Sequence, residues 1–267
     1  MHTPFTDGYN VLKSDCPPEG EQIKHPYRSI IGIITYAAYV SRPDIMYHAS
    51  KLGQVSQNPG LTHWNMAKRV LKYLYQTRDR GPFYKRNGPD LEMYSDSSYA
   101  DIKPETLDPS SDELRSTIAH VAMLSGGAIT WSSKVMKGKR ALSSGEAETA
   151  AASEACRTIL FLRGLLEFMT NKFEGPTPLK IDATVAITIA NREGLTNKSR
   201  HMQIKHLFIQ ECVIDNDMRV HKSNRGNVVT QKVDTTAQLA DPLTKPLGKI
   251  LHKQYLDILA PKLITRA

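Results

Sequence analysis

Apolar residues recur at every third or fourth position in segments between residues 27 and 74, and this spacing predicts helices. An apolar helix is expected from Tyr27 to Val40. Asp44 can cap a second helix that runs to about Ser56, and Thr62 can cap a third. The third helix has an apolar stripe, formed by Trp64, Ala67, Leu71 and Leu74. Residues 26–90 are therefore predicted to form a small helical unit.

Beyond Gly81-Pro82 the helical spacing gives way to short segments typical of strands. Gly126-Gly127 predicts the turn of a β-hairpin between Ser116–Leu124 and Ala128–Ser132. The other elements expected here are a strand at 91–96, a long helix at 145–169, a strand at 179–182, helices at 184–191 and 203–214, a strand at 228–233 and a broken helix at 236–246. This order predicts an α/β fold in which helices pack on a mixed sheet.

The same pattern divides the chain into four segments. Residues 1–25 are rich in Pro, Asp, Glu and Gly without periodicity, which predicts a flexible N-terminal segment. The helical unit at 26–90 follows, and then the mixed α/β domain at 91–247. Residues 248–267 are expected to form a C-terminal helix or tail.

The composition excludes several classes of protein. The chain has 267 residues, 40% hydrophobic and 23% charged, which is typical of a globular protein. Its three cysteines are far apart, which argues against a disulfide scaffold or a zinc knuckle and favours a reducing compartment. The longest apolar run, Ile30 to Val40, is too short to span a bilayer. Prolines and acidic residues in the first twenty positions argue against a signal peptide.

The formal net charge is +8, but it is unevenly distributed. Residues 1–90 carry a net charge of +5, residues 91–175 carry −3, and residues 176–267 carry +6. Chance explains a difference of this size. A cluster of metal-binding carboxylates between two phosphate-binding surfaces explains it equally well.

Four acidic residues lie where a metal site is expected. Asp96 and Asp182 come at or near the ends of predicted strands, Glu148 lies near the start of the long helix, and Asp241 begins the broken helix. Ligands in open sheets gather at strand ends, and an all-carboxylate set favours Mg²⁺ over zinc. Ordinary caps and turns also place carboxylates at such positions, so spacing alone does not decide between the two readings.

A set of motifs occurs in a fixed order along almost the whole chain. These motifs are YRSIIGIITYAAYVSRPDI (27–45), HWNMAKRVLKYL (63–74), YSDSSYAD (94–101), GGAITWSSK (126–134), LSSGEAETAAASEA (142–155), KIDATVAITIAN (180–191), HLFIQE (206–211) and QLADPLTKPL (238–247). In this order they resemble the C-terminal part of the Pol polyprotein of copia-type LTR retrotransposons. The first two resemble the connection region of the reverse transcriptase, and the others resemble its ribonuclease H domain.

This resemblance implies a ribonuclease H-like fold after a small helical connection subdomain. It also implies an endoribonuclease that cuts the RNA strand of RNA–DNA hybrids. The implied catalytic residues and metal ligands are Asp96, Glu148 (rather than Glu146), Asp182 and Asp241. The implied cofactor is a pair of Mg²⁺ ions, for which Mn²⁺ may substitute. The implied partners are the hybrid duplex and the polymerase part of the same polyprotein, with no membrane. The implied location is a cytoplasmic virus-like particle or the nucleus.

Several further residues are candidates for contact with nucleic acid. Lys134, Lys137, Lys139 and Arg140 could bind phosphates of the hybrid, or could form a solvated basic loop. Arg115-Ser116-Thr117 could hold a phosphate or a 2′-hydroxyl, or could form a turn and cap. His201 could transfer a proton, or could be an exposed histidine with no role in the chemistry. Trp131 is expected in the core.

Departures from the family pattern support an alternative function. Ala183 stands where the family usually has Asn, Gly145 where it has Thr, and Gln203 where an acid is common. The chain also contains no Asp-Asp pair, which the polymerase signature requires. The alternative is an inactive, truncated remnant of a retroelement that at most binds nucleic acid.

Overall fold

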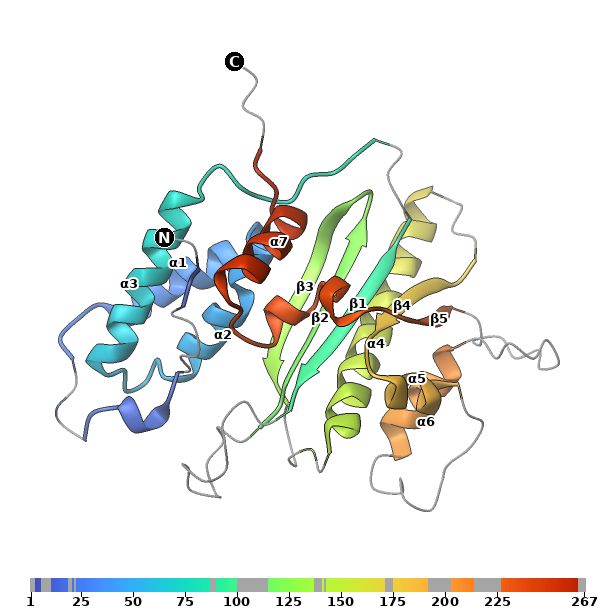
Figure 1. Ribbon diagram of the computed structural model, residues 1–267, viewed down its shortest axis with the longest axis horizontal. Helices are drawn as coiled ribbons and strands as arrows, with labels where there is room; N and C mark the ends of the chain where they lie inside the picture. Colours follow the sequence, from blue (N-terminus) through green and yellow to red (C-terminus); the bar gives the residue numbers. More distant parts are fainter. Residues whose placement is uncertain are drawn as a thin grey trace.

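A computed structural model shows one five-stranded sheet with helices on both faces (Figure 1). It describes residues 3–5, 11–18, 21, 23–86, 90–99, 115–136, 141, 143–170, 175–191, 203–213 and 227–263, with the backbone alone for 203–206. The strands are β1 (Glu92–Ser98), β2 (Thr117–Leu124), β3 (Gly127–Val135), β4 (Thr177–Ile181) and β5 (Val228–Lys232).

The sheet has the strand order β3-β2-β1-β4-β5. Strands β1, β2 and β3 pair antiparallel, whereas β4 pairs parallel with both β1 and β5. The hairpin between β2 and β3 turns at Ser125 and Gly126, which both have positive φ angles (54° and 79°). Two successive positive φ angles are typical of the tight turns that match the twist of a hairpin. The α/β fold class predicted from the sequence is confirmed.

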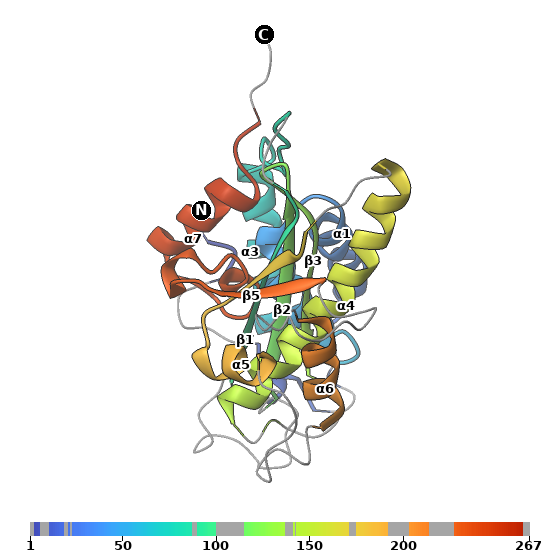
Figure 2. The same cartoon turned by 90° about the vertical axis from the view of Figure 1, so that its right-hand side faces the viewer.

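Two hydrophobic clusters divide the helices into two layers, and α7 (Lys249–Leu259) and α4 (Ser144–Thr170) lie on opposite sides of the strands (Figure 2). The first layer contains α1 (Tyr27–Val40), α2 (Met46–Gln54), α3 (Leu61–Gln76) and α7 (Lys249–Leu259). The second contains α4 (Ser144–Thr170), α5 (Thr184–Ala190) and α6 (Gln203–Cys212). Short 3-10 turns occur at η1 (Lys13–Asp15), η2 (Pro43–Ile45), η6 (Thr235–Ala237) and η7 (Asp241–Leu243).

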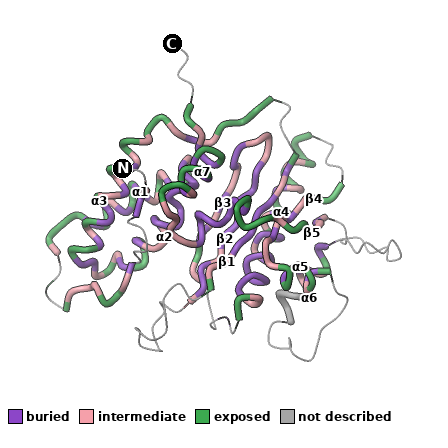
Figure 3. Tube along the Cα trace, in the orientation of Figure 1, coloured by how far each residue is buried: buried purple, intermediate pink, exposed green. Residues whose placement is uncertain are grey.

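Side chains that point alternately to the two faces of the sheet divide the core between these layers. Tyr94 and Val121 belong to the hydrophobic cluster formed with α1, α2 and α7, whereas their neighbours Met93 and Ala122 belong to the cluster formed with α4, α5 and α6. Successive side chains of a strand point to opposite faces, so both faces of the central strands are buried (Figure 3). Trp131 lies in the first cluster, as expected, and its Nε1 donates to Ala38 O (2.7 Å).

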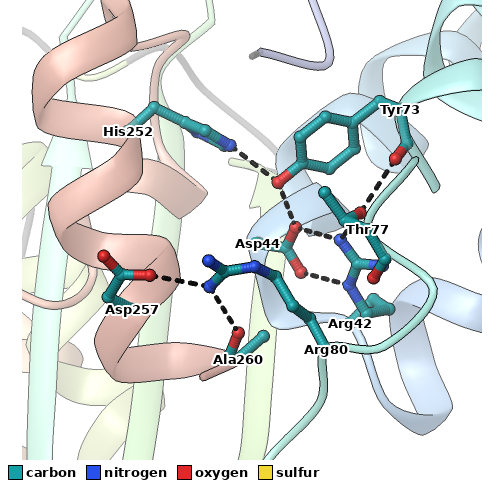
Figure 4. Close-up of polar contacts among 8 residues, drawn as sticks. All are labelled: Arg42, Asp44, Tyr73, Thr77, Arg80, His252, Asp257 and Ala260. Carbon is teal, nitrogen blue, oxygen red and sulfur yellow. Dashed lines mark hydrogen bonds and ion pairs between the residues drawn. The ribbon is translucent and has the colours of Figure 1, made fainter. Parts of the chain in front are cut away.

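A buried polar network joins the first helices to α7 (Figure 4). Arg42 donates two hydrogen bonds to Asp44, and the Tyr73 hydroxyl donates to Asp44 Oδ2 (2.8 Å). That hydroxyl also lies 2.9 Å from His252 Nε2 on α7, 179 residues away in sequence. Since its single proton goes to Asp44, His252 is the donor in the second contact. The network fixes α7 against the helices that precede the sheet.

Three local predictions are wrong. Asp44 does not cap a helix, because its carboxylate is buried in the ion pair with Arg42. Thr62 lies inside α3, whose N-cap is Gly60; its amide donates to His63 Nδ1 (3.0 Å). The broken helix at 236–246 is not an α-helix but the two short turns η6 and η7. Pro242 and Pro246 explain this, because proline supplies no backbone donor to a helix.

The four-segment division stays a prediction. Residues of α1, α2 and α3 share one hydrophobic cluster with β1, β2, β3 and α7. This shared cluster means that the helical unit packs directly on the sheet. Within the described residues, no helix is long and apolar enough to cross a membrane.

Candidate metal centre

Two neighbouring strands bring two of the predicted carboxylates to one edge of the sheet. Asp96 is in β1, opposite Ala119 of β2 and two residues before the end of the strand. Asp182 directly follows β4, which runs parallel to β1. The carboxyl ends of parallel strands lie at the same edge, so the two side chains converge there. Glu148 comes from α4, which packs against β1.

Asp96, Glu148 and Asp182 form a compact group. Each offers one carboxylate oxygen, and these oxygens all lie within 4.8 Å of one another. Asp96 and Glu148 are buried, and Asp182 is half-buried. Asp241, at the start of η7, is buried but lies outside this group.

Hydroxyl groups hold three of these carboxylates in place. The Ser97 backbone N–H and hydroxyl both donate to Glu148 Oε1 (3.3 and 2.9 Å). The Thr244 hydroxyl donates to Asp96 Oδ2 (2.5 Å). The Thr235 hydroxyl lies 3.5 Å from Asp182 Oδ2. The orientations of Asp96, Glu148 and Asp182 are therefore set by neighbouring side chains.

Burial and mutual repulsion raise the pKa values of Asp96, Glu148 and Asp182. Burial, and then the Glu148 carboxylate, raise the pKa of Asp96 to about 8. Burial, with a smaller contribution from Asp182, raises the pKa of Glu148 to about 7. Burial and the Asp241 carboxylate also raise the pKa of Asp182. Like charges in a buried site disfavour ionisation unless a cation neutralises them.

Lys245 brings a positive charge to this site. Lys245 Nζ lies 3.0 Å from Asp241 Oδ1, as an ion pair without hydrogen-bond geometry. Burial lowers the pKa of Lys245, but the Asp241 carboxylate more than offsets this, so the pKa is raised overall. Within the part of the chain that the structure describes, the one positive charge of Lys245 faces four carboxylates, which leaves the site short of positive charge.

The donor set fits a divalent metal ion. Within the part of the chain that the structure describes, Glu148 Oε2 and Asp241 Oδ1 are buried oxygens with no hydrogen-bond partner. Buried acceptors without a partner are unusual in proteins, and a metal ion would satisfy them. Carboxylate oxygens are the ligands that Mg²⁺ prefers.

The candidate nucleic-acid contacts differ in accessibility. The register pairs Thr117 with Ser98 of β1 and with Val135 of β3, so Arg115 and Lys134 lie near the same end of the sheet as the metal centre. Lys134 is exposed. Ser116 and Thr117 are buried, so a duplex could not reach their hydroxyls in this conformation. Lys137, Lys139, Arg140 and His201 lie outside the described residues.

Several functional contacts were not identified from the sequence. Ser97, Thr244 and Lys245 all lie inside the motifs noted above, but they carry no local signal beyond their place one to four residues after an aspartate. Gln238 is fully buried and donates to Ser95 O (3.0 Å). Its place in the motif QLADPLTKPL was the only signal that could have found it.

Several curated proteins with similar sequences come from plant transposons. The chain is 29% identical over 250 residues to the retrovirus-related Pol polyprotein from transposon TNT 1-94 of Nicotiana tabacum. It is 31% identical over 230 residues to that of transposon RE2 of Arabidopsis thaliana. These alignments cover 92% and 86% of the chain. The chain belongs to the retrotransposon Pol family.

This Pol chain spans only 17% and 14% of the length of those two polyproteins. It is also 37% identical over 139 residues, 51% of its length, to the secreted RxLR effector protein 161 of Plasmopara viticola, of which the alignment covers 91%. No family model matches the chain. A solved structure of LC11-RNase H1 in complex with an RNA/DNA hybrid aligns with 58% of this Pol chain and 93% of that chain. Its 14% identity and TM-score of 0.35 are too low to support a conclusion.

Proposed function

We propose that this chain is the ribonuclease H part of a retrotransposon Pol polyprotein and cuts the RNA strand of RNA–DNA hybrids. The observation that carries the proposal is the convergence of Asp96, Glu148 and Asp182 within 4.8 Å in a chain of the Pol family. Three clustered carboxylates with raised pKa values, two of them buried and one half-buried, are costly for folding, and a metal-dependent reaction accounts for them.

Asp96, Glu148, Asp182 and Asp241 would hold two Mg²⁺ ions, which Mn²⁺ can replace. Bound there, the ions would supply the positive charge that activates water and stabilises the leaving oxygen of a phosphodiester. The chain's own residues orient this site. Thr244 and Ser97 fix the carboxylates of Asp96 and Glu148, so these side chains need little rearrangement when substrate arrives.

Basic residues near this end of the sheet would hold the hybrid through its phosphates. Arg115 and Lys134 are the described candidates, and Lys137, Lys139 and Arg140 stay predictions. The Ser116 and Thr117 hydroxyls could contribute only after a rearrangement that exposes them. His201 stays a predicted proton-transfer group. The polymerase part of the polyprotein is the proposed protein partner.

The decisive experiment uses the 267-residue chain with Mg²⁺ and labelled RNA–DNA hybrid, double-stranded RNA or double-stranded DNA. We expect cleavage of the RNA strand in the hybrid alone. Asp96→Asn and Asp182→Asn should abolish cleavage while hybrid binding is kept or strengthened, because each removes a negative charge near the phosphates. Asp90→Asn, at an exposed position before β1, is the matched control and should cleave normally.

Two outcomes contradict this proposal. If the wild-type chain cuts no hybrid, the alternative of an inactive remnant is favoured, and the alanine at position 183, which offers no side-chain cap to α5, becomes one candidate cause. If the chain cuts double-stranded RNA and hybrid equally well, it is a nuclease that does not require a DNA strand.

A further inference from the structure

The segment between β5 and α7, residues 235–245, crosses the sheet beside the metal centre, and we call it the crossing segment (Figure 1). It contacts both aspartates of the sheet edge. Thr235 lies beside Asp182, and Thr244 donates to Asp96. Gln238 lies between these two contacts in sequence, and its side chain is fully buried.

The Gln238 amide connects two strands. Its Nε2 lies 3.0 Å from Ser95 O of β1 and 3.5 Å from Lys180 O of β4. An amide nitrogen has two hydrogens, so it can donate to both carbonyls at once. Its Oε1 accepts from the Ala240 backbone N–H (3.3 Å), which fixes the orientation of the amide group.

These contacts occur where the direct pairing of β1 and β4 ends. The parallel register pairs Met93 with Leu179 and Tyr94 with Lys180 and goes no further. Asp96 is the residue after Ser95, and Asp182 is the second residue after Lys180. The strands reach the metal centre just beyond their last pair, so their separation there needs another constraint.

We propose that Gln238 is a positioning residue, which bridges Ser95 O and Lys180 O and thereby holds Asp96 and Asp182 at the separation that Mg²⁺ requires. This rests on the proposed function, because it assumes that these aspartates bind the metal ion. Mg²⁺ demands near-ideal octahedral geometry, whereas Ca²⁺ accepts flexible arrangements of six to eight oxygens. Loss of the bridge should therefore weaken Mg²⁺ binding more than Ca²⁺ binding.

The test measures Mg²⁺ and Ca²⁺ affinity by titration calorimetry on the full 267-residue chain. Gln238→Met keeps the length of the side chain but removes both donors. We expect at least a tenfold loss of Mg²⁺ affinity, within the range seen when residues that orient metal ligands are replaced. The loss of Ca²⁺ affinity should be several-fold smaller. A purely structural role would lower the urea midpoint without changing the ratio of the two affinities.

Gln210→Met is the matched control. Gln210 also donates through Nε2 to a backbone carbonyl, Ile189 O (3.0 Å), but it comes from α6. This variant should bind Mg²⁺ and Ca²⁺ as the wild type does. Gln238→Asn keeps the amide on a side chain one methylene shorter, and it serves if Gln238→Met does not fold. It should show the same selective loss of Mg²⁺ affinity.

The outcomes separate this inference from the proposed function. Equal losses of Mg²⁺ and Ca²⁺ affinity, or Mg²⁺ affinity within twofold of the Gln210→Met control, would overturn the role of Gln238 even if the wild type cuts hybrid. A wild-type chain that binds Mg²⁺ but cuts no hybrid refutes the nuclease, and the selective loss in Gln238→Met would still stand. Absence of Mg²⁺ binding by the wild type would overturn both.

Discussion

Replacing Asp96 with asparagine should stabilise the metal-free protein at alkaline pH. The wild-type carboxylate is buried beside Glu148 and must ionise there as the pH rises. The asparagine side chain has almost the same shape as the aspartate side chain that it replaces. Its carbonyl oxygen can still accept from Thr244, and its amide can donate to the carboxylates that remain. The change therefore removes a charge with little loss of packing.

The pKa shift sets an upper limit to this gain. The pKa of Asp96 rises from 3.8 to about 8 on folding. At about 1.4 kcal/mol for each unit, a shift of about four units corresponds to on the order of 5 kcal/mol. The neighbouring carboxylates take up protons over the same pH range as Asp96, and this reduces the repulsion that an ionised Asp96 meets. We therefore expect Asp96→Asn to raise the free energy of unfolding by about 2–3 kcal/mol.

The direction of the pH dependence follows from the number of protons that each state binds. Between about pH 4 and pH 8 the folded state keeps a proton that the unfolded state has lost, so wild-type stability falls as the pH rises through this window. The gain from Asp96→Asn should be largest at pH 8 and small near pH 4.

Urea unfolding in EDTA at pH 5 and pH 8 measures this gain directly. Asp90→Asn, at an exposed position, should change stability by less than about 0.5 kcal/mol at both pH values. The reasoning is refuted if Asp96→Asn is no more stable than the wild type at pH 8. It is also refuted if the gain is the same at both pH values.

Three further predictions address the site and the fold. Mg²⁺ affinity should rise between pH 6 and pH 8, by up to about tenfold per pH unit for each proton displaced from Asp96 or Glu148. Calorimetry in two buffers should detect the proton release, and a pH-independent affinity would contradict this prediction. Asp241→Asn should keep part of the cleavage activity with Mn²⁺, because Asp241 lies outside the compact group, and a complete loss equal to that of Asp96→Asn would argue against this. Tyr73→Phe should lower the free energy of unfolding by about 2 kcal/mol, because Asp44 loses a buried donor, whereas Tyr75→Phe at an exposed position should not change it in the same urea assay.

Sequence signals predicted the features whose conformation depends on residues close together in the chain. The hairpin followed from Gly126-Gly127, and Gly126 does adopt a positive φ, which few residues other than glycine adopt without strain. The turn lies one residue earlier than this pair suggests, because the second positive φ is at Ser125 and Gly127 already belongs to β3. The convergence of Asp96 and Asp182 followed from the rule that parallel strands end at a common edge. Resemblance to the Pol family selected Glu148 over Glu146, and Glu148 is the glutamate that joins the compact group.

Contacts between distant residues could not be predicted in this way. Asp44 has the residue type and the place of a helix cap, but Arg42 and Tyr73 bind its carboxylate instead. Gln238 has no local feature that distinguishes it from a surface glutamine. Its role depends on two carbonyls at Ser95 and Lys180, and only the assembled sheet brings these together.

The crossing segment is synthesised after the three acidic residues of the compact group that it contacts or adjoins. Asp182 precedes Thr244 by 62 residues, which a ribosome adds in roughly 3–12 s at about 5–20 residues per second. Until residue 238 is added, a nascent chain carries Asp96, Glu148 and Asp182 but neither Gln238 nor Thr244. A chain that stops before residue 238 would contain the five strand segments but would lack α7 and its buried side chains, together with the contacts that align Asp96. Premature termination late in the reading frame would therefore remove part of the core as well as the contacts that orient the carboxylates of the proposed nuclease.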